Sequence, residues 1–68
     1  MSINKIKAFV TAVEYGSLTK AAEQLDYTQP SISHMISSLE MDYGFSLLIR
    51  GKNGVKPTEN GKALVHFP

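Results

Sequence analysis

Serine and histidine side chains gather in the segment 31–38, and this pairing of residue types can support covalent catalysis. Ser31, Ser37 and Ser38 lie three or four residues from His34, so on a helix their hydroxyls would come within reach of the imidazole. A serine nucleophile also needs an acid that orients the histidine, donors for the oxyanion and a pocket that excludes water. No acid stands where it would orient His34, and an exposed helix face offers no pocket, so these residues do not predict an enzyme.

The same segment is better suited to the non-covalent recognition of DNA. The major groove of B-DNA is about 12 Å wide and admits a helix only when the groove-facing side chains are short. At about 100° per residue, one helix face here would be small and mostly polar: Pro30, His34, Ser37, Ser38 and Met41, flanked by Ser31 and Ser33. The Gln29 amide can pair with the N6 and N7 groups of adenine, and the free amides near the helix start favour a phosphate.

A basic stretch follows this segment. Residues 1–49 hold three lysines against five acidic residues, whereas residues 50–68 hold Arg50, Lys52, Lys56 and Lys62 against Glu59 alone. Because residues 50–56 contain no acid, they can contact phosphate, although a solvated loop would explain the same charges.

The 68 residues correspond to one small domain without cysteine. The absence of cysteine excludes disulfides and thiolate metal sites, and His34 and His66 are too few and too far apart to suggest zinc, so we expect no metal and no cofactor. Self-association is the remaining means of supporting so small a core. The longest apolar run, 47–49, is far below the ~20 residues of a membrane span, and residues 1–7 lack the apolar stretch of a secretory signal, which favours the cytoplasm.

Apolar spacing predicts two helices before residue 26. The first covers 3–15, where apolar residues recur with a period near 3.6: Ile3, Ile6, Phe9, Val10 and Val13. Gly16 can end it in the left-handed conformation, and Ser17 can cap a second helix over 18–25, with its apolar face at Leu18, Ala21, Ala22 and Leu25. A three-residue turn follows, in which we expect Tyr27 to fill the space between two helices, with a phosphate contact as the alternative.

A third helix is predicted over 29–43. Thr28 can cap it by accepting the amide of Ser31, and Gly44 can end it. Its apolar face would consist of Ile32, Ile36, Leu39 and Tyr43. Glu40, beside that face, is expected to be a structural partner of a backbone or basic group.

The remaining residues predict a hairpin and a short last helix. The turn dipeptide Asn53-Gly54 joins strands within 47–56, and the tip over residues 50–54 carries the basic stretch. Thr58 can cap a helix over 58–66, which Gly61 would interrupt and Pro68 would stop. The fold class is therefore mainly α: a winged helix-turn-helix with a three-helix core, a two-stranded wing and the start of a C-terminal linker helix.

Two functions fit this fold. In the first, the helix 29–43 enters the major groove of DNA and the basic wing 50–56 contacts the backbone or minor groove. In the alternative, the same helix contacts a protein. A protein-binding face would favour aromatic and long apolar residues, which are scarce here, so DNA is favoured; the salt dependence of binding to random duplex would distinguish the two.

Specific motifs resemble a known family. Residues 16–25 (GSLTKAAEQL) and 28–33 (TQPSIS), followed by Leu39-Glu40, Gly44, Leu47 and Arg50, resemble the N-terminal domain of LysR-type transcriptional regulators. The resemblance continues through Gly54-Val55 and residues 57–61 and covers essentially the whole chain.

This resemblance implies a bacterial DNA-binding domain over 1–57 and the truncated start of a linker helix over 58–68. Such regulators read pseudo-palindromic promoter sites as dimers and carry a C-terminal domain that senses a metabolite, so the chain is expected to be an excised fragment or a truncated product in which dimerisation is weak or absent. The resemblance implies that the residues at matching positions contact bases, and these are Gln29, Pro30, Ser33 and His34. It implies a phosphate contact for Thr28, with Ser31 beside it. It also implies contacts with the backbone or minor groove for Arg50, Lys52 and Asn53.

Three positions depart from the family pattern. His34 stands where the family commonly has Arg or Lys, and because histidine gains a proton just below neutral pH, we expect binding to tighten toward about pH 5.5. Ser37 and Ser38 replace positions that are often basic, which predicts a shallow salt dependence for a dimer. Leu48 replaces a usual Phe and is expected to be part of the core.

Overall fold

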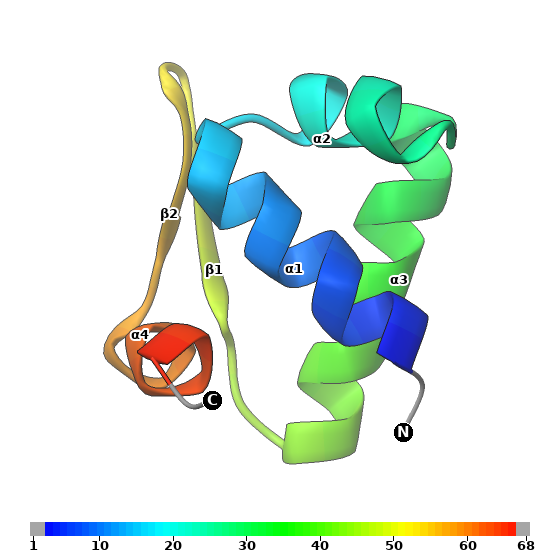
Figure 1. Ribbon diagram of the computed structural model, residues 1–68. Coiled ribbons are helices and arrows are strands. Elements are labelled where there is room, and N and C mark those ends of the chain that lie inside the picture. The colour runs from blue at the N-terminus through cyan, green and yellow to red at the C-terminus, as the bar shows by residue number, and fades with distance from the viewer. Residues whose placement is uncertain (1–2, 67–68) are drawn as a thin grey trace.

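The protein is a helical domain with a two-stranded wing, seen in a computed structural model that describes the main chain of residues 3–66 and the side chains of residues 4–65. The elements in chain order are α1 (Ile3–Tyr15), α2 (Leu18–Leu25), α3 (Gln29–Tyr43), β1 (Leu48–Gly51), β2 (Gly54–Pro57) and α4 (Glu59–His66). In Figure 1, α1 lies between α3 and the hairpin, α2 covers one end, and α4 lies at the other end. The winged helix-turn-helix is therefore confirmed. The side chains of Ile3 and His66, and Pro68, lie outside the described residues.

The ends of the first three helices agree with the sequence prediction because local chemistry sets them. Gly16 and Gly44 have φ of 63° and 82°, the left-handed conformation that glycine adopts without steric cost. The Ser17 hydroxyl accepts a hydrogen bond from the amide of Lys20 at 3.1 Å and thereby caps α2.

The core lies where α1, α2 and α3 meet the start of the wing. The largest fully buried side chains are Phe9, Ile32, Ile36, Leu39 and Leu47. Full burial of an aliphatic or aromatic side chain contributes about 1.5–3 kcal/mol, so these residues supply much of the driving force for folding.

The buried stripe of α1 differs from the predicted one. It is centred on Ala8, Phe9 and Ala12, each with no exposed surface, while Val10 and Val13 are only partly buried. The periodicity correctly identified Phe9 but favoured the larger side chains around it. Small alanines lie at the centre because they allow α1 to approach its neighbours closely.

The wing is an antiparallel pair in which Leu48 faces Pro57 and Gly51 faces Gly54. This register leaves Lys52 and Asn53 as the turn residues, so the predicted Asn53-Gly54 turn was wrong by one position. Gly54 serves a different purpose: its φ is 117°, and a Cβ there would overlap the carbonyl oxygen of Gly16. The neighbouring amide of Val55 donates to the same oxygen at 3.1 Å, which fixes the wing to the α1–α2 turn.

Tyr27 does not fill the space between the helices, because 42% of its surface is exposed. The main chain shapes this turn instead. Asp26 takes the left-handed conformation with φ of 61°, and the Tyr27 amide donates to the carbonyl of Ala22 at 2.9 Å. A polar residue at the left-handed position and a backbone hydrogen bond thus replace the expected aromatic packing.

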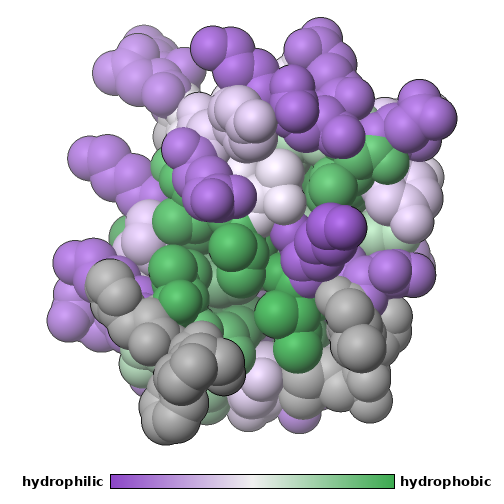
Figure 2. Space-filling model, in the orientation of Figure 1, coloured by the Kyte–Doolittle hydropathy of each residue, from purple (hydrophilic) through white to green (hydrophobic). Residues whose placement is uncertain are grey.

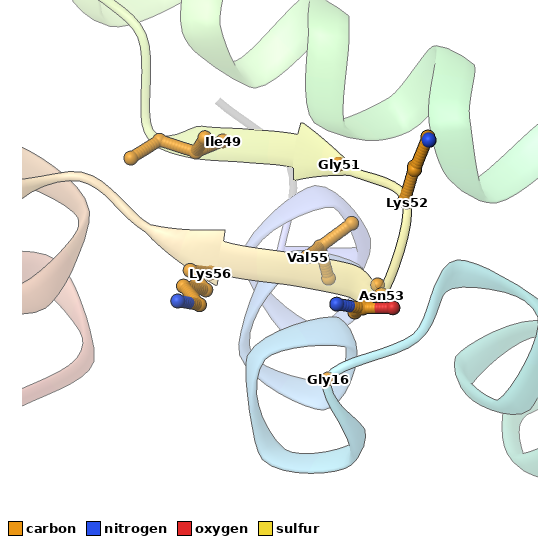
Figure 3. Close-up of a pocket in the computed structure, with 8 residues that line it drawn as sticks. Gly16, Ile49, Gly51, Lys52, Asn53, Val55 and Lys56 are labelled. Carbon is orange, nitrogen blue, oxygen red and sulfur yellow. The ribbon is translucent and has the colours of Figure 1, made fainter.

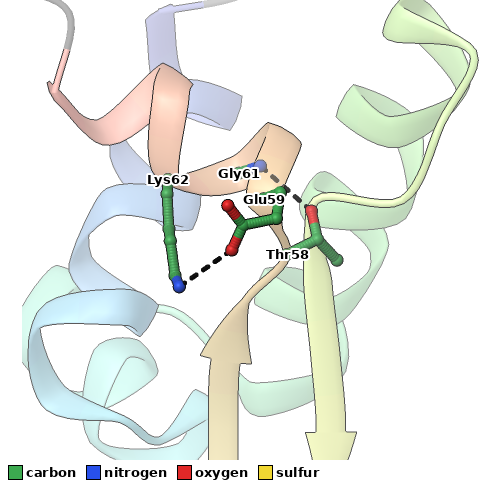
Figure 4. Close-up of polar contacts among 4 residues, drawn as sticks. All are labelled: Thr58, Glu59, Gly61 and Lys62. Atoms are coloured by element: carbon green, nitrogen blue, oxygen red, sulfur yellow. Dashed lines mark hydrogen bonds and ion pairs between the residues drawn. The ribbon is translucent and has the colours of Figure 1, made fainter.

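Helix α4 is continuous over Glu59–His66, so the predicted interruption at Gly61 was wrong. Gly61 is buried, and a Cβ there would overlap the carbonyl oxygen of Leu47. Thr58 caps this helix as expected, because its hydroxyl accepts from the Gly61 amide at 3.0 Å (Figure 4). The same hydroxyl donates to the carbonyl of Ser46 at 2.8 Å, which ties α4 to the segment before β1.

Candidate nucleic-acid interface

The start of α3 is held by a capping network that the sequence predicted. The Thr28 hydroxyl accepts from the Ser31 amide at 3.2 Å, and it also donates to the Ser31 hydroxyl at 3.0 Å. Pro30 lies in the first turn, where a missing amide hydrogen has no cost. All residues from Thr28 to Ser31 are exposed, so this helix start faces solvent.

The outward face of α3 is opposite the buried residues Ile32, Ile36 and Leu39. His34 and Ser37 are exposed on it, and Ser33 is partly exposed. Met41, at the far end of this face, is 83% exposed and is the one long apolar side chain there. The small, mostly polar face predicted for this helix is therefore accessible to a partner.

Arg50 is not at the wing tip, where the sequence prediction had placed it. It lies within β1, opposite Val55, and its guanidinium reaches back to α3. Nη1 donates to the Ser33 hydroxyl at 2.6 Å, and Nη2 donates to the Ser37 hydroxyl at 3.4 Å. The structure thus brings Arg50 to two serines that lie 17 and 13 positions before it in the chain, and no local pattern could have indicated this pairing.

Glu40 joins the other end of α3 to the wing, and the structural role expected for it is confirmed. One carboxylate oxygen, Oε2, accepts from the amide of Leu47 at 2.8 Å and from the amide of Leu48 at 3.2 Å. A carboxylate that accepts two backbone amides fixes the direction in which the chain enters β1. The position of the wing relative to α3 therefore depends on this side chain.

The wing tip presents the remaining predicted residues to solvent. Lys52 and Asn53 are exposed at the turn, and Lys56 is exposed on β2. Figure 3 shows them around a shallow groove beside Gly16, with Ile49 on the neighbouring strand. In Figure 1 the tip points toward the same end of the molecule as α2 and the start of α3.

The positive charge of the wing is not neutralised within residues 3–66. The two ion pairs in this described range join Lys5 to Asp42 at 3.1 Å and Lys62 to Glu59 at 3.0 Å, both away from the turn. Figure 2 shows hydrophilic side chains along the edge that holds α2 and the wing tip, while hydrophobic surface gathers lower, between α1 and α4. The exposed end of the molecule therefore combines polar and cationic groups suited to an anionic partner.

The described residues hold neither a metal-binding cluster nor a membrane-spanning helix. No three His, Cys, Asp or Glu side chains there come together closely enough to hold a metal ion. None of the helices in that range is long and apolar enough to cross a membrane.

Residues 3–62 of the chain match a family model described as bacterial regulatory helix-turn-helix protein, lysR family. The chain belongs to the LysR family. The resemblance seen in residues 16–61 is thereby confirmed, and the family is one of transcriptional regulators, not of enzymes.

Relatives of this LysR-family chain are regulators of greater length. The chain is 48% identical over 64 residues to the nitrogen assimilation regulatory protein nac of Klebsiella aerogenes. This match covers 94% of the chain and 21% of that relative. The chain therefore spans about a fifth of the length of the curated relatives it matches.

Solved structures of LysR-family members share this fold closely. The structure of the CbnR_DBD–DNA complex superposes with a TM-score of 0.92 and 34% identity, covering 96% of the chain and 75% of that structure. The BenM_DBD/catB site 1 DNA complex superposes with a TM-score of 0.91 and 40% identity, and the match covers 96% of the chain and 73% of that structure.

Proposed function

We propose that this LysR-family chain binds double-stranded DNA in a sequence-specific manner, with α3 in the major groove and the wing 50–56 on the adjacent backbone or minor groove. The base-reading side chains are those of Gln29, Pro30, Ser33 and His34. The groups that hold the sugar-phosphate backbone are Thr28, Ser31, Arg50, Lys52 and Asn53.

One observation carries the proposal: an exposed, slender polar face on α3 lies on the same molecule as a cationic wing whose charge no described acid neutralises. A helix of about 10–12 Å diameter fits a major groove of about 12 Å only if its outward side chains are short, as Ser33 and Ser37 are. The exposed start of α3, where the helix dipole favours an anion, and the wing lysines then supply attraction for phosphates on either side.

The solved structures of relatives support the same function. CbnR_DBD and BenM_DBD, which share this fold at 34% and 40% identity, were solved in complexes with DNA. By extension, we assign residues 1–57 to DNA binding and residues 58–68 to the start of a linker helix. The full regulator would act in the cytoplasm as a homodimer on a pseudo-palindromic promoter site, with dimerisation weak or absent in residues 1–68 alone.

The proposal is tested by selecting bound duplexes from a random pool and measuring affinity for the selected sequence. Gln29→Ala should lose discrimination at one base position, by about 1–3 kcal/mol, because its amide reads a base edge. Lys52→Ala should weaken all duplexes alike, because phosphates carry no sequence information. Equal losses in both variants on every sequence would contradict this division of roles.

Salt dependence distinguishes DNA binding from contact with a protein, which the exposed Met41 on α3 would favour. Two or three cationic contacts from the wing predict that affinity for duplex falls roughly 10- to 40-fold between 50 and 200 mM salt, since each neutralised phosphate contributes a slope of about −0.9. An affinity that does not change over this range would support the protein-contact function instead.

A further inference from the structure

Among the described side chains of residues 4–65, the guanidinium of Arg50 is the one group whose hydrogen bonds bridge the wing and the proposed base-reading face. It lies on β1, yet its two terminal nitrogens contact Ser33 and Ser37, one helical turn apart on α3. The shorter contact, 2.6 Å from Nη1 to the Ser33 oxygen, is a short, charge-assisted hydrogen bond. Arg50 therefore does more than add positive charge to the wing.

The chemistry of the two groups decides the direction of this hydrogen bond. Arginine has donors and no acceptor, so the Ser33 oxygen must accept. A serine hydroxyl carries one hydrogen, and that hydrogen remains available for a different partner. Accepting a bond from a cation also polarises the hydroxyl and makes it a better donor, because hydrogen bonds in a chain strengthen one another.

We propose that Arg50 is a positioning residue for sequence recognition: it commits the Ser33 hydroxyl to donation, so that Ser33 reads a purine N7 in the major groove. This inference rests on the proposed function and deepens it. N7 is the acceptor that adenine and guanine share on their major-groove edge, whereas at the same place a pyrimidine presents C5, with a hydrogen in cytosine or a methyl group in thymine, which cannot accept a hydrogen bond. A single committed donor therefore selects a purine over a pyrimidine on one strand.

Ser37 has a supporting part in this arrangement. Its hydroxyl accepts from Nη2 at 3.4 Å and so holds the plane of the guanidinium against α3. Two contacts from one rigid fork restrict the rotamers of Arg50 and Ser33 before DNA arrives, which lowers the entropic cost of ordering them on binding. A lysine at position 50 would keep the charge but could not present this planar pair of donors.

The test uses the 68-residue chain and the duplex that it selects from a random pool. Affinities are measured for all four base pairs at each position, with wild type, Ser33→Ala, Arg50→Lys and the double variant. Ser33→Ala identifies the base pair that depends on the hydroxyl. At that pair we expect wild type to prefer a purine about two- to tenfold, the effect of one hydrogen bond, and Arg50→Lys to reduce this preference.

Two comparisons separate positioning from simple charge. In the Ser33→Ala background, Arg50→Lys should leave base preferences unchanged, because the residue through which it acts is gone. Lys52→Gln, which removes a wing charge without a contact to Ser33, should weaken all duplexes while leaving the purine preference intact. Replacing the purine by its 7-deaza analogue should lower wild-type affinity by the same two- to tenfold and leave Ser33→Ala unaffected.

Several results would overturn the inference. A uniform loss for Arg50→Lys with the purine preference retained would make Arg50 a phosphate contact only, and an unchanged wild-type affinity for the 7-deaza duplex would exclude N7. Ser37→Ala keeps the charge of Arg50 and provides a second variant if Arg50→Lys unfolds; it should reduce the same preference in part, and no reduction counts against the inference. Failure of wild type to enrich any duplex would instead refute the proposed function.

Discussion

Replacement of Glu40 tests whether one carboxylate holds the wing in place. Its Oε2 accepts two backbone amides in a partly buried setting, at 2.8 Å from Leu47 and 3.2 Å from Leu48. A hydrogen bond to a charged group contributes about 1.5–3 kcal/mol, and loss of the acceptor leaves two amides without a partner. We therefore expect Glu40→Ala to lower the free energy of unfolding by about 2–3 kcal/mol, a large part of the total for so small a domain.

The corresponding shift in melting temperature follows from the size of the chain. With an unfolding entropy of about 2.1 cal/mol/K per residue, each kcal/mol corresponds to about 7 °C for a domain of this length, so Glu40→Ala should melt about 15–20 °C lower. Glu40→Gln keeps a neutral acceptor and should lose about 1 kcal/mol. Thermal unfolding followed by circular dichroism measures both.

The matched control is Glu14→Ala, the same change at an exposed position of α1. Exposed substitutions in helices usually alter stability by no more than about 0.5 kcal/mol. If Glu40→Ala melted within a few degrees of Glu14→Ala, the two amide contacts would not stabilise the wing, and the reasoning from hydrogen-bond geometry would be refuted.

Two further predictions concern single residues. Gly61→Ala should destabilise the domain by about 1–3 kcal/mol in urea unfolding, because its Cβ would overlap the Leu47 carbonyl; an unchanged midpoint would show that α4 can move away freely. Thr28→Ala should cost about 1 kcal/mol by removing the α3 cap, while Thr28→Ser should retain most of it; equal losses would mean that the hydroxyl is not the stabilising group.

The helices could be predicted because their limits depend on residues within a few positions of one another. Gly16 and Gly44 end helices through their own φ angles, and Thr28 caps α3 through an amide three residues away. The apolar period also identified Phe9, Ile32, Ile36 and Leu39 as core. It could not rank Ala8 and Ala12 above Val10 and Val13, because that ranking depends on how closely neighbouring helices approach α1.

The exposure of the candidate interface residues was predicted, but their geometry was not. The exposed residues from Thr28 to Ser31 follow directly from the helix face, and the exposed Lys52 and Asn53 follow from the hairpin. Arg50 carried the correct charge in the prediction but lay in the wrong place. Its register opposite Val55 is set by strand pairing, and its contact with α3 is set by the packing of the whole wing.

By itself, the sequence determined the helix-turn-helix, its caps, the accessible polar face of α3 and the presence of a basic wing, because helical periodicity and capping act over three or four residues. Only the tertiary structure decided which glycines lie against distant backbone, Gly54 against Gly16 and Gly61 against Leu47, and which hydroxyls the guanidinium of Arg50 contacts. Such contacts join positions far apart in the chain, and their existence depends on the packed arrangement of all the elements rather than on any local pattern.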